Sequence, residues 1–226
     1  MNSTQKRALA QIENHKKGLL AKRSESSLTQ ILNSEPCQKL LNECREYRER
    51  IYTPVKTLFM FIKQVLNSDK SCQKAVSGTV TEQISAGKST SSTNTGPYCK
   101  ARKRLPEETV HALVKETGKQ SLSGIRAGWK IYGRETKLVD GSMLLMPDTP
   151  ENQKQFPQHG NQKKGAGFPL ARLVVVMSLT VGSVIDYAIG ANKGKGTGEH
   201  SLFRLIQNCI EKDDILLGDC YYPSFF

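Results

Sequence analysis

The spacing of the apolar residues changes near residue 130, and this change constrains the fold more than any other feature of the chain. Up to about Trp129, apolar side chains recur every three or four residues, which is typical of one face of a helix. Beyond Gly133 they form short runs separated by turn residues, which is typical of strands. The pattern predicts an α+β protein, with an all-helical region over residues 1–130, of which 1–48 are a helical extension, and an α/β region over residues 131–226.

Start and stop signals divide the helical region. The stretch "TPVKTLFMFIKQVLNS" has Thr53 as an N-cap and Pro54 at the first helical position. This helix is expected to form the core of the region through a wide apolar face, made by Val55, Leu58, Phe59, Ile62, Val65 and Leu66. A Ser/Thr/Gly-rich connector, "SAGKSTSSTNTG", leads to a basic helix, a break at Leu105-Pro106 and a further helix. These two helices resemble a helix-turn-helix in outline.

The second region predicts a three-stranded meander, a helix and a further strand. The stretch "KLVDGSMLLMP" is expected to form two short strands with a turn at Asp140-Gly141. In "PLARLVVVMSLTVGSVIDYAIGA" two strands are expected to meet at a turn that Gly182 supplies. A helix capped near Thr197 follows, and "ILLGD" is then expected to be a buried strand that ends at Asp219.

The charge of the chain favours a polyanion as partner. Thirty-three Lys and Arg residues against 21 Asp and Glu residues give a formal net charge of +12. Such a surplus attracts nucleic acid, because each phosphate that a cation neutralises releases condensed counterions. The alternative is a basic surface without a partner.

The cysteines and histidines give a zinc site little support. The six cysteines include no C-x-x-C pair, and the four histidines are scattered. Reduced structural thiols are the better interpretation.

The sequence predicts neither a secretory signal nor a membrane-spanning helix. The stretch "MNSTQKRALAQIENHKKGLL" carries charges throughout and has no apolar core of a secretory signal. The longest apolar run, "LVVVMSLTVGSVI", has 13 residues, whereas a helix that crosses a membrane needs about 20. The sequence therefore predicts a cytoplasmic protein with no membrane partner.

Two basic stretches are candidates for contact with DNA. In "YCKARKRLP" the cationic side chains crowd one helix behind an aromatic ring that could stack on a sugar or base, and the candidate residues are Tyr98, Lys100, Arg102, Lys103 and Arg104. In "NKGKGTGEH", Lys193 and Lys195 lie among glycines whose backbone amides could approach a phosphate. The alternatives are a solvated helix face for the first stretch and a flexible connector for the second.

Asp140 and Asp219 are the candidate metal ligands. Each follows strand-forming aliphatic residues, and the predicted strand order would bring the two strands side by side. Carboxylates placed together repel each other unless a cation lies between them, and Mg²⁺ prefers oxygen ligands of this kind. Two such ions can serve phosphodiester chemistry. The alternative from spacing alone is an Asp-Gly turn and an unrelated aspartate at a strand end.

Several stretches together resemble the DDE transposases of the insertion sequence 4 family. They are "TSSTNTGPYCKARKRLP", "LVDGSMLLMPDTPENQKQFPQ", "GFPLARLVVVMSLTVGSVIDYAIGANKGKGTGE" and "ILLGDCYYPSFF". The resemblance implies a ribonuclease-H-like catalytic domain that is incomplete here, a helical DNA-binding region before it, and metal-dependent strand cleavage and transfer at transposon ends with Mg²⁺ or Mn²⁺. It implies that Asp140 and Asp219 are the first and second catalytic carboxylates. It also implies a homodimer that bridges two ends of double-stranded DNA and a bacterial, nucleoid-associated location.

The chain departs from that family in two places. Cys220 stands where the family usually has an arginine, and no acidic residue after Asp219 can supply the third carboxylate. Asp148 and Glu199 match family stretches, but we interpret them as capping or loop residues. The expectation is a transposase truncated before its third carboxylate and impaired in catalysis. The alternatives are a DNA-binding remnant that competes with intact transposase, and a ribonuclease-H-like nuclease unrelated to transposition.

Overall fold

The computed structural model describes residues 30–44, 51–89, 92–161, 163, 165–220 and 222. The chain divides into two compact units, a helical unit up to Val110 and a sheet unit from His111 onward. The division lies within α6 (Glu107–Ser123), so the boundary that we predicted at residue 130 moves toward the N-terminus. The reason is that the later part of α6 packs against a strand of the sheet unit.

The helical unit contains the Thr53-capped helix, the basic helix and the helix after Pro106 in the order that the sequence predicts. Within the described residues, its elements before α6 are α2 (Glu35–Asn42), α3 (Pro54–Leu66), α4 (Cys72–Ser85) and α5 (Gly96–Lys103). The predicted N-cap of α3 is confirmed, because the Thr53 side chain accepts a hydrogen bond from the backbone N–H of Lys56 at 3.3 Å. The core of this unit contains Tyr52, Met60, Val76, Tyr98 and Ala101.

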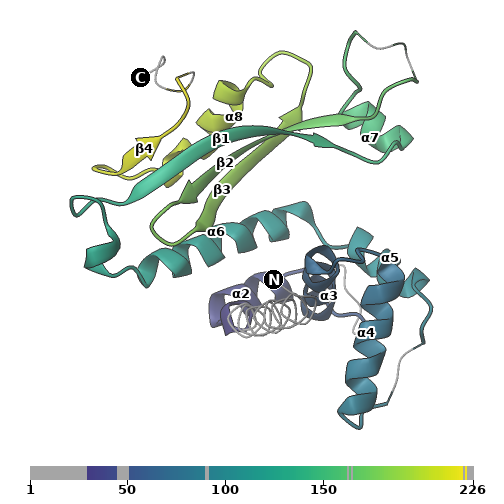
Figure 1. Cartoon of the computed structure of the whole chain (residues 1–226). Coiled ribbons are helices and arrows are strands. Elements are labelled where there is room, and N and C mark those ends of the chain that lie inside the picture. Colours follow the sequence, from purple (N-terminus) through teal and green to yellow (C-terminus); the bar gives the residue numbers. More distant parts are fainter. Residues whose placement is uncertain are drawn as a thin grey trace, which may run out of the picture. The chain divides into compact units, whose positions relative to one another are not determined.

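Four strands form one mixed sheet within the described part of the chain (Figure 1). They are β1 (Thr136–Leu145), β2 (Leu170–Ser178), β3 (Ser183–Ala191) and β4 (Ile215–Leu217), in the spatial order β3-β2-β1-β4. The pairs β1–β2 and β2–β3 are antiparallel, whereas β4 runs parallel to β1. Among the described residues, this unit also contains α6 from His111 onward, α7 (Pro150–Gln155), α8 (Glu199–Ile206) and the 3₁₀ turns Ala127–Trp129 and Gln207–Cys209. The predicted meander, helix and further strand are confirmed.

The predicted turn at Asp140-Gly141 is wrong, because β1 continues through both residues. Its ladder with β2 runs without a break from Lys137 to Leu145. The turn between β2 and β3 is confirmed, and Gly182 adopts the positive φ of 67° that favours glycine there. The strand β4 is only partly buried, because it is a short edge strand.

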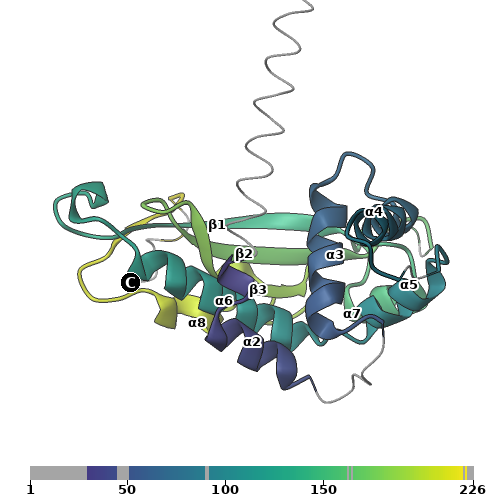
Figure 2. The ribbon, with the colours of Figure 1, turned by 90° about the horizontal axis from the view of Figure 1, so that it is seen from below.

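α8 covers one face of the sheet, and α6 lies along the edge strand β3 (Figures 1 and 2). The core between α8 and the sheet includes Val139, Val174, Val176, Ala188, Leu202, Phe203 and Ile206. Where α6 packs against β3, a Cβ on Gly118 of α6 would lie 2.7 Å from the carbonyl oxygen of Val184. Glycine therefore permits this close approach of helix to strand. Among the described residues, no helix has both the length and the apolar character needed to cross a membrane.

Candidate functional site

The parallel ladder between β1 and β4 brings the two predicted aspartates to one edge region of the sheet. Leu138 pairs with Leu217 at the last rung of this ladder. Asp140 and Asp219 each follow that rung by two residues, on segments that leave it in the same direction. The ladder therefore places two carboxylates that are far apart in the sequence at corresponding positions beyond its last rung.

Gly218 lets the chain pass close to β1 just before Asp219. A Cβ on Gly218 would lie 3.0 Å from Cγ1 of Val139 and 3.2 Å from the Tyr222 ring. Val139 is buried in the core, whereas the next residue, Asp140, is exposed, as the alternation of a strand requires. Gly218, the residue before Asp219, thus lies directly beside Val139, the residue before Asp140.

A third carboxylate, Glu199, lies against β1 next to Asp140. A Cβ on Gly141 would come within 2.6 Å of Cδ of Glu199 and 2.9 Å of its Oε2. The backbone N–H of Gly141 also donates to Oδ1 of Asp140 at 2.8 Å. We expected Glu199 to cap a helix or lie in a loop; it is instead the first residue of α8, and its carboxyl group packs on the strand. A glycine inside a strand was the signal that could have indicated this close approach.

Tyr222 shows that the three carboxylates share one neighbourhood. Its ring is buried in the core and packs edge-on against Phe203, with 5.6 Å between the ring centroids. Burial, together with the negative charges of Glu199, Asp140 and Asp219, raises the pKa of Tyr222 to about 12. The ionisation of the Tyr222 hydroxyl therefore depends on the charges of all three acidic side chains.

A buried ion pair positions the segment that leads into β4. The Lys137 ammonium lies 2.6 Å from Oδ2 of Asp214 and donates to the carbonyl of Cys209 at 2.7 Å. Asp214 also accepts from the backbone N–H of Glu211 at 2.8 Å. Both charged groups are almost fully buried, so this pair ties the chain before β4 to β1.

The donor atoms at this edge suit a hard divalent cation. In the described residues, no three or more His, Cys, Asp or Glu side chains lie close enough together to hold a metal ion. Mg²⁺ typically keeps several waters and is held by one or two carboxylates together with substrate phosphates. Asp140 and Asp219 supply oxygen ligands of this type, and Gly141 leaves room for the Glu199 carboxylate against β1. The residues present fit Mg²⁺ or Mn²⁺.

The loop between β3 and α8 carries Lys193 and Lys195, and both side chains are exposed. Its base is fixed by Arg172, which donates to the side chain of Asn192 at 3.1 Å and to the carbonyl of Thr197 at 3.4 Å. Since the loop leads directly into Glu199, its two lysines lie close in the chain to an acidic residue of the candidate site.

The five DNA contacts predicted on the basic helix α5 include both exposed and buried side chains. Lys100, Lys103 and Arg104 are exposed. Tyr98 is fully buried, so our prediction that its ring is available to stack on a sugar or base is corrected. Its hydroxyl donates to Oε1 of Gln64 at 2.8 Å inside the core. Burial, partly offset by a nearby guanidinium, raises the pKa of Tyr98 to about 12.

Arg102 makes intramolecular contacts instead of pointing only to solvent. Its Nη1 donates to Oε1 of Gln64 at 3.1 Å and lies 3.4 Å from Sγ of Cys72. The guanidinium also lies 4.6 Å from the centroid of the Phe61 ring. These contacts give Arg102 a structural role in the helical unit, because they satisfy a buried amide.

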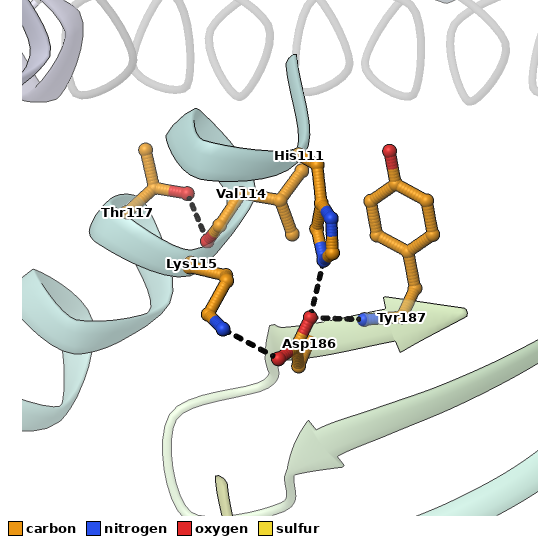
Figure 3. Close-up of polar contacts among 6 residues, drawn as sticks. All are labelled: His111, Val114, Lys115, Thr117, Asp186 and Tyr187. Carbon is orange, nitrogen blue, oxygen red and sulfur yellow. Dashed lines mark hydrogen bonds and ion pairs between the residues drawn. The ribbon is translucent and has the colours of Figure 1, made fainter. Parts of the chain in front are cut away.

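A second group of charged residues joins α6 to β3 (Figure 3). Asp186 is buried, and its Oδ1 lies 2.6 Å from Nε2 of His111 and accepts from the backbone N–H of Tyr187 at 2.8 Å. Its Oδ2 lies 3.1 Å from the ammonium of Lys115. The His111 ring also packs at 4.6 Å from the Tyr187 ring. This group fastens the helix to the strand, because a buried carboxylate is stabilised by its cationic and N–H partners.

No protein family, curated protein or solved structure matches the chain.

Proposed function

We propose that this protein binds the DNA ends of a transposable element and takes part in metal-dependent strand cleavage and transfer there, as a DDE transposase of the insertion sequence 4 family. The observation that carries the proposal is the placement of Asp140 and Asp219 beyond one shared rung of the β1–β4 ladder, with Glu199 beside them. Acidic groups gathered in this way are stabilised by a divalent cation.

The order of the strands supports a ribonuclease-H-like assignment for the sheet unit. Three antiparallel strands are followed by α8 and then by β4, which pairs parallel to the first strand. This order places the carboxyl ends of β1 and β4 together, and ligand sites in mixed α/β sheets commonly form at such ends.

The residues divide into two groups of roles. Asp140 and Asp219 would hold Mg²⁺ or Mn²⁺, which when bound lowers the pKa of water and neutralises charge on a phosphate. Glu199 adds negative charge beside Asp140 and strengthens the attraction for that cation. Lys193 and Lys195, with Lys100, Lys103 and Arg104, would contact DNA phosphates and orient the duplex. A second copy of the chain would bind the other end of the element.

Cleavage and binding assays with matched variants test the proposal. Purified protein is incubated with duplexes from the ends of the element that encodes it, with Mn²⁺, Mg²⁺ or chelator. We expect weak metal-dependent nicking in the wild type, in line with the impaired catalysis expected from the sequence, and its loss in Asp140→Asn and Asp219→Asn. Glu211→Gln is the control, since it removes an exposed acidic side chain of the same unit. Calorimetric titration with Mn²⁺ should show weaker binding for the two aspartate variants alone.

Each outcome separates the alternatives. Nicking that persists in Asp140→Asn would contradict the assigned site. Salt-dependent binding of DNA by every variant, with no cleavage by any of them, would favour the non-catalytic DNA-binding alternative. Absence of salt-dependent DNA binding in the wild type would overturn the proposal as a whole.

A further inference from the structure

The segment between α6 and β1 is exposed at every position. It comprises residues 126–134, the aromatic loop, and it projects at one end of the sheet unit (Figures 1 and 2). Trp129 is 52% exposed, Ile131 51% and Tyr132 95%. Folded proteins usually bury most of the area of an aromatic side chain, because each ring carries a large apolar surface. Two exposed rings so close together in one loop therefore indicate a surface that meets a partner.

A tight turn forms the tip of the aromatic loop. The backbone N–H of Arg134 donates to the carbonyl of Ile131 at 2.9 Å, and these two residues form an isolated β-bridge. Between them, Tyr132 and Gly133 have positive φ angles of 52° and 76°, as the two central residues of a type I′ turn do. Gly, Asn and Asp are usual in that conformation, and a tyrosine is rare and strained there. The turn holds the Tyr132 ring out at the tip of the loop.

The charge of the aromatic loop is wholly positive. Its cations are Arg126, Lys130 and Arg134, and no Asp or Glu occurs between residues 124 and 134. Among the described residues, none of these three cations forms an ion pair. The first acidic residue after the loop, Glu135, is buried. The loop therefore presents unbalanced positive charge beside its rings.

Rings next to unbalanced cations fit single-stranded nucleic acid. The guanidinium of Arg126 lies 5.5 Å from the centroid of the Trp129 ring, so charge and ring are presented together. In proteins that bind single strands, aromatic rings stack on the bases while cations follow the phosphates. A base within a duplex is stacked on its neighbours, so an unpaired base is the one that offers its face to a side chain. A second copy of the chain fits this loop less well, because two such loops would repel each other.

We propose that Trp129 and Tyr132 stack on unpaired bases of single-stranded DNA, and that the three cations of the loop neutralise the neighbouring phosphates. The inference rests on the proposed function, which supplies DNA and, through strand cleavage, unpaired bases. The aromatic loop leads into β1, and Asp140 lies six residues after Arg134, which is about 20 Å at the rise of a β-strand. A strand held at the metal site would therefore reach the loop within a few nucleotides.

The fluorescence of Trp129 tests the stacking directly, because Trp129 is the only tryptophan in the sequence. The full chain is titrated with a short oligothymidylate, with an abasic strand of equal length and with a blunt duplex. We expect saturable quenching by the oligothymidylate, because a stacked base quenches the indole. The abasic strand carries the same phosphates without bases, so it should bind without quenching. The blunt duplex should quench little.

Matched variants separate stacking from folding. Trp129→Ala and Tyr132→Ala should each weaken binding of a labelled oligothymidylate by about fivefold or more in fluorescence anisotropy, and should leave binding of the blunt duplex nearly unchanged. Trp129→Phe should retain most of the affinity, because it keeps a ring. Phe168→Ala is the control, since it removes an exposed ring of the same unit outside the loop. Thermal unfolding of all four variants should match that of the wild type, because the substituted side chains are exposed.

The outcomes distinguish this surface from the proposed function. Equal affinities of the wild type, Trp129→Ala and Tyr132→Ala for the single strand would overturn the stacking surface and leave the proposed function intact. Quenching by vesicles of anionic lipid but not by oligothymidylate, or quenching that grows with protein concentration alone, would also overturn it. Single-strand binding that depends on both rings, in a protein that binds no duplex, would support the stacking surface and contradict the proposed function. Failure of the wild type to bind either form of DNA would remove both.

Discussion

The carboxyl carbon of Glu199 lies 2.6 Å from the position that a Cβ on Gly141 would occupy. A strand residue with any side chain would displace this carboxylate, because the two groups cannot share the space. The glycine after Asp140 therefore leaves the space in which a third acidic side chain packs against β1.

Substitution of Gly141 by Ala should separate site geometry from stability. The Glu199 side chain can swing away, so we expect the free energy of unfolding to change by less than about 1 kcal/mol. Calorimetric titration should nevertheless show weaker binding of Mn²⁺. Gly128→Ala is the control, since nothing lies within 4 Å of a Cβ there. Equal Mn²⁺ affinity in both variants would contradict a role for Glu199.

Replacement of Lys137 by Met should strongly destabilise the sheet unit. The substitution leaves the buried Asp214 carboxylate without its cation, and breaking a buried pair in this way typically costs about 3–5 kcal/mol. Urea unfolding measures the loss. The double variant Lys137→Met/Asp214→Leu should recover part of it, because no unpaired charge remains. A double variant no more stable than the single one would argue against the pair as the cause.

Two glycine substitutions in helices should change stability in opposite directions. Gly118→Ala should destabilise by about 1–3 kcal/mol, because its Cβ would meet the backbone of Val184 and Ile185 at 2.7 and 3.0 Å. Gly78→Ala in α4 should stabilise by about 0.5–1 kcal/mol, because nothing lies within 4 Å and alanine is the better helix former. Thermal unfolding measures both effects. Stabilisation by Gly118→Ala would show that α6 does not approach β3 so closely.

Alkaline pH should destabilise the helical unit through Tyr98. Its pKa is raised to about 12 by burial, from an ordinary value of 10.0. Because the pKa is higher in the folded state, the neutral Tyr98 side chain contributes its full stabilisation of the folded state below about pH 10. This stabilisation is lost as the pH rises from about 10 through about 12. Urea midpoints measured from pH 8 to 12 should fall less steeply in Tyr98→Phe than in the wild type. The variant should be less stable at neutral pH by about 1 kcal/mol, since it loses the bond to Gln64. Parallel curves for the two proteins would refute this role.

The apolar face predicted for α3 shows which buried residues the spacing of apolar side chains predicts and which it misses. Leu58 is buried as expected, but Val65 and Leu66 are exposed, whereas Thr57 and Gln64 are buried. The Gln64 amide is accommodated because Tyr98, Arg102 and the carbonyl of Lys70 satisfy it. Such partners lie up to 38 residues away in the chain, so a local pattern of apolar residues does not contain them.

The sequence by itself determined the elements whose cause is local. The Thr53 cap depends on hydrogen bonds within one turn of helix, and the Gly182 turn depends on the backbone freedom of one residue. The tertiary structure alone decided that β1 continues through Asp140, that the sheet unit begins within α6, and that Glu199 lies on Gly141. The physical reason is that these features depend on strand pairing and close packing between distant segments, which local propensity does not specify.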